Sequence, residues 1–118
     1  MYKRNKGDTM TLDMTSFGRL IASARKAQQL SQKELAALIE KEDGETITPQ
    51  YLNDIEHDRR SPSSDHLVNQ FAKVLKIPAT ALFAAVGMLS EDTRKLVKKS
   101  TPDKVDNAYV AFRKALKD

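Results

Sequence analysis

The side chains with the clearest chemical capacity in this sequence are hydrogen-bonding groups gathered in one short segment, residues 48–57. Its apolar residues, Leu52 and Ile55, are three positions apart and so fall on one face of a helix. The polar members of the segment are Gln50, Tyr51, Asn53 and Asp54. A glutamine amide offers the acceptor and donor that match N6 and N7 of adenine, so the chemistry on offer here is recognition by hydrogen bonding.

Catalytic and metal-binding chemistry has little support in the sequence. The chain has no cysteine, which excludes disulfides, cysteine-based zinc sites and thiolate catalysis. His57 and His66 are isolated and are interpreted as surface or loop residues, and the four glycines are scattered rather than gathered in a phosphate-binding loop. We therefore expect no enzyme, no metal and no cofactor, and nothing indicates a small-molecule ligand.

Length and charge are typical of one small domain that could carry a second function in a tail. A chain of 118 residues can bury a modest core, and its net charge of +4 permits a polyanionic partner without requiring one. Residues 88–118 hold eight Lys/Arg against five Asp/Glu, whereas residues 31–47 hold five acids against two lysines. No apolar run is long enough to span a bilayer, and the basic start is not followed by the apolar region of a secretion signal. The sequence therefore predicts a cytoplasmic protein without a membrane partner.

The elements that must position residues 48–57 are all predicted to be helices, because helical spacing recurs and alternation with a period of two is absent. Ser31-Gln32-Lys33-Glu34 has the form of a capping box and begins a helix that should end before Gly44. Thr48-Pro49 begins the next, which turn residues 58–64 end after His57. Flanking helices are expected from Thr15 or Ser16 to about residue 30, from Ser63 or Ser64 to about residue 76, and over 79–86. The apolar positions of these helices are Phe17, Leu20, Ile21, Ala24, Ala27, Leu35, Ala36, Leu38, Ile39, Leu52, Ile55, Leu67, Val68, Phe71, Ala72, Leu75, Leu82 and Phe83.

The two ends of the chain are predicted to differ from this middle part. Residues 1–15 lack a pattern and are interpreted as a flexible basic N-terminal arm, and residues 16–87 as the main domain. Residues 88–118 are expected to form a helical extension, with a short helix from Ser90 to about Lys99 and a last helix that starts at Thr101-Pro102. The last helix carries one apolar stripe, which is either a lid on the domain's own core or a dimerisation element; we favour dimerisation. The stripe consists of Val105, Ala108, Tyr109, Phe112 and Leu116.

Five short fragments occur in a characteristic order over residues 17–83. They are Phe17-Gly18-x-x-Ile21-x-x-x-Arg25, Leu30-Ser31-Gln32-Lys33-Glu34-Leu35-Ala36, Thr48-Pro49-Gln50-Tyr51-Leu52-Asn53-Asp54-Ile55-Glu56, Arg59-Arg60-Ser61-Pro62-Ser63 and Phe71-Ala72-x-x-Leu75. Each fragment alone is weak, but the ordered set, which covers somewhat more than half of the chain, resembles the Cro/repressor (Xre) helix-turn-helix family. The resemblance implies an all-α fold, with a five-helix lambda-repressor-like domain followed by extra C-terminal helices, and double-stranded DNA as a partner.

The resemblance also implies roles for individual residues. The helix 48–57 would enter the major groove, with Gln50 as the first base reader. Tyr51 would touch a thymine methyl or a phosphate, or shelter the turn before it, and Asp54 would accept from cytosine N4 or tune the site against phosphates. The residues expected to read bases are Gln50, Tyr51, Asn53 and Asp54, and those expected to contact phosphates are Ser31, Gln32, Lys33, Thr48, Arg59 and Arg60. Arg25 and Glu56 are expected to form a structural ion pair between the first and third helices.

One departure from the family pattern lies between the second and third helices. Residues 40–47 fill this turn, which is about six residues longer than usual, and four of the eight are acidic. Such a segment would repel a phosphate backbone and is expected to point away from DNA or to contact something else. The leading interpretation is a homodimeric, sequence-specific transcription regulator, most simply a repressor. The alternative is a protein-interaction module or antitoxin-like adaptor on the same fold, indicated by the acidic turn and the apolar last helix.

Overall fold

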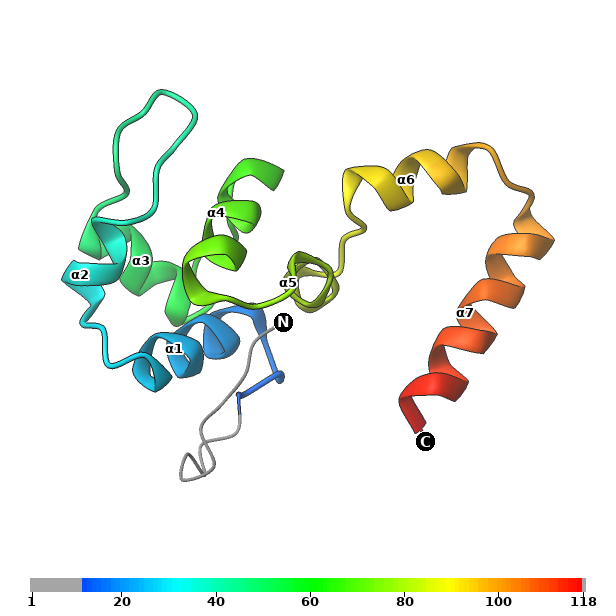
Figure 1. Ribbon diagram of the computed structural model, residues 1–118, viewed down its shortest axis with the longest axis horizontal. Helices are drawn as coiled ribbons and strands as arrows, with labels where there is room; N and C mark the ends of the chain where they lie inside the picture. The colour runs from blue at the N-terminus through cyan, green and yellow to red at the C-terminus, as the bar shows by residue number, and fades with distance from the viewer. Residues whose placement is uncertain (1–11, 118) are drawn as a thin grey trace. The chain divides into compact units, whose positions relative to one another are not determined.

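The computed structural model describes residues 12–117, and every named element over that range is a helix (Figure 1). One compact unit ends at Met88 and a second begins at Leu89. The first unit holds α1 to α5, and the second holds α6 and α7. The helices are α1 (Phe17–Ala27), α2 (Gln32–Ala36), α3 (Pro49–Glu56), α4 (Asp65–Leu75), α5 (Ala79–Val86), α6 (Glu91–Lys98) and α7 (Pro102–Lys117). The all-α prediction is confirmed.

Polar side chains at the predicted positions begin most of these helices. Ser16, Thr48, Ser64 and Ser90 each accept a hydrogen bond from a backbone N–H in the first turn of α1, α3, α4 and α6. The box at α2 is complete, since the Ser31 hydroxyl accepts from the Glu34 N–H at 3.0 Å and the Glu34 carboxylate accepts from the Ser31 N–H at 2.8 Å. Local sequence therefore fixes where these helices start.

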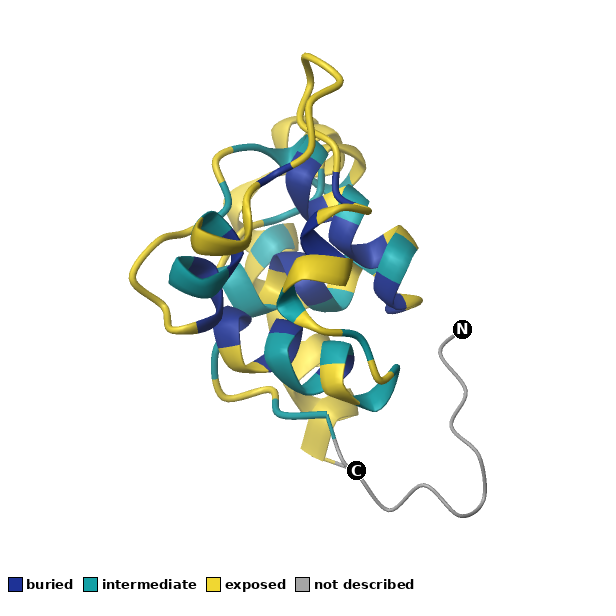
Figure 2. Ribbon diagram, turned by 90° about the vertical axis from the view of Figure 1, so that its left-hand side faces the viewer, coloured by how far each residue is buried: buried dark blue, intermediate teal, exposed yellow. Residues whose placement is uncertain are grey.

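The core of the first unit is formed by apolar residues from all five of its helices (Figure 2). Leu52 and Ile55 of α3 are fully buried, which fastens this helix to α1 and α2. Two of the predicted apolar positions do not take part: Ala27 is only half-buried, and Leu38 follows the end of α2 and is 51% exposed. The buried apolar residues are Phe17, Leu20, Ile21, Ala24, Leu35, Ala36, Ile39, Ile47, Leu52, Ile55, Leu67, Val68, Phe71, Ala72, Leu75, Ile77, Leu82 and Phe83.

Gly18 lets α1 approach α3 very closely. A Cβ atom at this position would overlap the carbonyl oxygen of Ile55 and lie 2.7 Å from that of Glu56, and both are backbone atoms that cannot turn aside. The turn after α3 closes the same contact, because the Asp58 carboxylate accepts from the Gly18 N–H at 3.0 Å and from the Ser16 hydroxyl at 2.7 Å. The orientation of α3 against α1 is thus fixed both by the close packing at Gly18 and by the hydrogen bonds of Asp58.

The long acidic segment between α2 and α3 folds back on itself as a hairpin that projects from the ends of these helices (Figure 1). Glu40 and Thr46 form an antiparallel bridge, and the Ile47 N–H donates to the Ile39 carbonyl at 3.0 Å. Gly44, at φ +87°, makes the reversal at its tip. Because the hairpin closes between two buried isoleucines, α2 and α3 remain in contact despite the added residues.

The second unit has a different character, because none of its described residues is buried. The apolar stripe of α7 is open, with Tyr109 43%, Phe112 51% and Leu116 71% exposed. The rings of Tyr109 and Phe112 meet edge to face at 6.4 Å. Together with Leu96 and Val97 of α6 they line a cleft of about 350 Å³.

Of the predicted N-terminal arm, residues 1–11 lie outside the described residues. The remainder, residues 12–15, is fastened to α1 rather than loose. Leu12 packs against the core, and the Asp13 N–H donates to the Ser23 hydroxyl at 2.9 Å. Within residues 12–117, no helix has both the length and the apolar character needed to cross a membrane.

Candidate nucleic-acid interface

The outward face of α3 presents the polar residues singled out from the sequence. Gln50 is exposed, and Tyr51, Asn53 and Asp54 are half-buried. The helix starts at a fixed point, because the Thr48 hydroxyl accepts from the Tyr51 N–H at 3.0 Å and Pro49 occupies the first helical position. α3 therefore offers hydrogen-bonding side chains on a rigid support.

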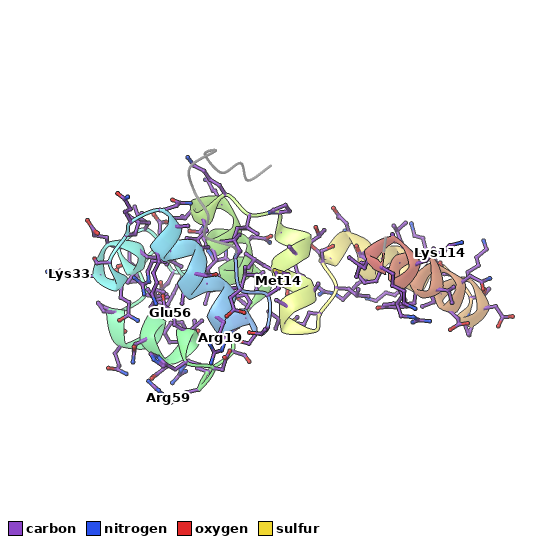
Figure 3. All side chains as sticks on the ribbon, turned by 90° about the horizontal axis from the view of Figure 1, so that it is seen from below. Met14, Arg19, Lys33, Glu56, Arg59 and Lys114 are labelled. Carbon is purple, nitrogen blue, oxygen red and sulfur yellow. The ribbon has the colours of Figure 1, made fainter. Side chains whose placement is uncertain are left out.

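Gln50, Asp54 and Arg59 form one connected network on this face. The Gln50 amide nitrogen donates to Asp54 Oδ1 at 3.1 Å. The same oxygen accepts from Arg59 through Nε at 3.2 Å and through the terminal nitrogen at 3.0 Å. Arg59 is 55% exposed and lies at the edge of the first unit (Figure 3). Two of the residues expected to read bases, Gln50 and Asp54, are thus linked to one expected to contact phosphates, Arg59.

Tyr51 packs beside the root of the hairpin. The Arg60 guanidinium lies over its ring, 5.1 Å from the centroid, in a cation–π contact. The Tyr51 hydroxyl is buried and has no hydrogen-bond partner among the described residues. The ring borders a cleft of about 280 Å³ shared with Lys41, Thr48 and Ser63. In this position Tyr51 shelters the long turn, while Arg60 keeps its charge at the surface.

Gln32 is turned inward, unlike the phosphate contact expected of it. Its amide nitrogen donates to Asn53 Oδ1 at 3.1 Å and to Glu56 Oε1 at 2.9 Å, which uses both of its N–H groups. Gln32 therefore joins α2 to α3, and it turns the Asn53 amide so that its nitrogen donates to none of the residues 12–117. Lys33, one position later, is exposed and lies at the periphery of the unit (Figure 3).

The start of α2 also carries a perturbed carboxyl group. The hydrogen bond from the Ser31 backbone N–H, followed by that from the Ser31 hydroxyl, lowers the pKa of Glu34 below its ordinary value. Glu34 therefore stays ionised and keeps the capping box closed, leaving the N–H groups of Gln32 and Lys33 as the open donors of this helix start.

Arg25 and Glu56 join α1 to α3 beneath this surface. The arginine donates through Nε to Oε2 at 2.7 Å and through a terminal nitrogen to Oε1 at 3.0 Å, a two-point contact. Both side chains are largely buried, at 12% and 3% exposure. The remaining terminal nitrogen of Arg25 donates to the Leu30 carbonyl at 2.9 Å, so the pair also fixes the turn between α1 and α2.

Two features of the site were not anticipated from the sequence. Asp58, assigned only to a turn, holds the first turn of α1 and has a φ of +59°, a conformation that aspartate tolerates better than most residues. The second is the hydrogen bond between Gln50 and Asp54, for which the sequence does hold a signal, because residues four apart are neighbours on a helix.

Within residues 12–117, no cluster of His, Cys, Asp or Glu side chains could hold a metal ion.

Comparison with known protein families gives a match. A family model described as helix-turn-helix matches residues 21–82, a range that begins within α1 and ends within α5. No curated protein and no solved structure matches the chain. The matched range includes α2, the hairpin and α3, so the long turn does not prevent the match.

Proposed function

The chain belongs to the helix-turn-helix family of DNA-binding regulatory domains, and on that premise we propose that it is a sequence-specific transcription regulator whose α3 enters the major groove. The observation that carries the proposal is the division of α3 into two faces. Leu52 and Ile55 are fully buried, whereas Gln50 is exposed on a helix with fixed ends. Repression is the proposed mode, because occupancy of a promoter is sufficient for it.

In this proposal the residues divide between bases and backbone. Gln50 and Asn53 supply donors and acceptors to base edges, because the inner bonds of Asn53 leave its amide nitrogen available. Lys33, Arg59 and Arg60 supply exposed positive charge to phosphates, beside the helix starts at Ser31 and Thr48. Tyr51 contributes through its packed ring rather than through its buried hydroxyl.

Replacing Gln50 by alanine and replacing Arg59 by alanine should weaken DNA binding in different ways. Gln50→Ala should lose about 1–3 kcal/mol of binding free energy on the preferred duplex, with the loss confined to one base position. Arg59→Ala should weaken binding to all duplexes by a similar factor, because a phosphate contact carries no sequence information. Fluorescence anisotropy with the preferred duplex and its single-base variants measures both effects.

Thermal unfolding of each variant is the control for folding. Equal weakening of every duplex by both substitutions would contradict a reading helix. A wild-type chain that selects no sequence from random duplexes, yet captures one protein in stoichiometric amount, would instead support the interaction module.

We further propose that the protein acts as a homodimer through α6 and α7. The cleft of about 350 Å³ between these helices is lined mainly by apolar side chains that are not buried in the single chain. The occupant that fits is a second copy, because dimeric helix-turn-helix proteins read two half-sites about 34 Å apart through two-fold symmetry.

The charges of α7 favour an antiparallel pairing of two copies. Asp103, Lys104 and Asp106 give the first part of α7 a net charge of −1, whereas Arg113, Lys114 and Lys117 give its last turns a charge of +3. When two such helices cross in opposite directions near Tyr109, the acidic start of each faces the basic end of the other. Parallel pairing would instead place like charges together. The open residues of this surface are Leu96, Val97, Val105, Tyr109, Phe112 and Leu116.

The Phe112→Asp substitution should convert the dimer into a monomer. It places a charge in the apolar surface without disturbing a core, since Phe112 is 51% exposed in the single chain. Affinity for a duplex with two half-sites should fall about 100-fold or more, because the second contact is no longer intramolecular. Sedimentation equilibrium and anisotropy measure the two changes.

Leu38→Asp is the matched control, because Leu38 is also apolar and 51% exposed but lies in the first unit. It should leave the molecular mass in solution unchanged. A Phe112→Asp variant with the same mass and affinity as the wild type would show that α7 does not hold two copies together.

A further inference from the structure

The Asp54 carboxylate connects Gln50 and Arg59 on the exposed face of α3. Its Oδ1 atom accepts three hydrogen bonds, one from Gln50 at 3.1 Å and two from Arg59 at 3.2 Å and 3.0 Å. The Asp54 side chain is 25% exposed, whereas the side chain of Arg59, in the turn after α3, is 55% exposed. Asp54 therefore orients the side chains of Gln50 and Arg59 through these hydrogen bonds, which already occupy its Oδ1 atom.

The chemistry of the carboxylate dictates how the Gln50 amide is turned. An aspartate carboxylate accepts hydrogen bonds and has none to donate, so the glutamine must direct its nitrogen, and not its oxygen, toward Asp54. One of the two Nε2–H groups is thereby committed. The oxygen accepts no hydrogen bond from the described residues, so Gln50 presents one acceptor and one remaining donor to the outside.

The remaining donor and acceptor of Gln50 match the major-groove edge of adenine but not that of guanine. Adenine offers a donor at N6 and an acceptor at N7, which one acceptor and one donor satisfy. Guanine offers acceptors at both O6 and N7, which demand two donors. With one donor held by Asp54, Gln50 cannot supply both.

We propose that Asp54 is a positioning residue that makes Gln50 select adenine over guanine. The inference rests on the proposed function, in which Gln50 faces the major groove. Asp54 also holds the Arg59 guanidinium beside the reader, leaving other N–H groups of that arginine for a phosphate. Base selection and backbone contact are thus coupled through one oxygen atom.

The Asp54→Ala substitution tests this inference. At the base position that Gln50→Ala identifies, the wild type should prefer adenine to guanine by about tenfold or more, and Asp54→Ala should reduce that ratio to about threefold or less. Preferences at other positions should stay unchanged, and affinity for unrelated duplexes should rise because a negative charge near the phosphates is lost. Competition anisotropy with duplexes that differ only at that base gives the ratios.

Two further variants make the test specific. Asp54→Asn keeps the shape but can donate as well as accept, so it permits the Gln50 amide to turn over and should also lower the ratio. Arg59→Ala removes the other partner and keeps the acceptor, so it should weaken all duplexes while preserving the ratio.

An unchanged ratio in a folded Asp54→Ala variant would overturn the inference. So would a loss of preference at a different base from that affected by Gln50→Ala, because Asp54 would then read a base directly. If the wild type has no base preference at all, the proposed function fails before this inference is reached.

Discussion

Replacing Glu56 by alanine is expected to lower the free energy of unfolding by about 3–5 kcal/mol, the largest effect on stability among the substitutions considered. The substitution leaves the Arg25 guanidinium, 12% exposed, without the carboxylate that accepts two of its hydrogen bonds. It also removes an acceptor of Gln32, which loosens α2 from α3. Urea unfolding followed by circular dichroism at neutral pH measures the change.

Arg59→Ala is the matched control for this effect, because it also breaks an arginine–carboxylate pair. That pair is exposed, at 55% and 25%, and such pairs contribute about 1 kcal/mol or less. A Glu56→Ala variant that unfolds within about 1 kcal/mol of the wild type would contradict the role of the buried pair in joining α1 to α3.

The second large effect concerns the dependence of DNA binding on salt. In the proposed dimer, three of the exposed cationic side chains near α2 and α3 of each protomer are assigned to phosphates, namely Lys33, Arg59 and Arg60. If that dimer neutralises about six phosphates, its affinity should fall on the order of 1,000-fold between 50 and 200 mM salt, because binding releases counterions from DNA and that release becomes less favourable as salt rises. Titration of one duplex at several salt concentrations gives the slope.

The salt dependence should be shared by specific and unrelated duplexes, since phosphates are the same in both. The Arg60→Ala variant should show a shallower slope. A wild-type affinity that changes less than about tenfold over this range would contradict binding through the backbone of DNA.

Features of the fold that depend on neighbouring residues could be predicted from the sequence. The capping box at Ser31 and the Thr48-Pro49 start place α2 and α3, because hydroxyl groups satisfy the open N–H groups of a first turn locally. The spacing of Leu52 and Ile55 likewise fixed which face of α3 would be buried. These signals position the site to within a residue or two.

Features that depend on competition between distant groups could not be predicted. The Gln32 amide could donate either to a phosphate or to acceptors on α3. It donates to Asn53 and Glu56 because α2 and α3 pack closely, and the sequence does not show that packing. The closure of the acidic hairpin depends on backbone hydrogen bonds, from the Ile47 N–H to the Ile39 carbonyl and from the Lys41 N–H to the Glu45 carbonyl, which join residues that are not neighbours in the sequence.

The most direct measurement of the central claim, that α3 reads DNA in the major groove through Gln50, is a cycle of two substitutions. One is Gln50→Ala, and the other is 7-deazaadenine in place of the preferred adenine, which removes the N7 acceptor from the groove. Each alone should weaken binding by about 1–3 kcal/mol, and together they should weaken it little further, since they delete the same contact. Fully additive losses, or no loss with the modified duplex, would show that Gln50 does not contact that base.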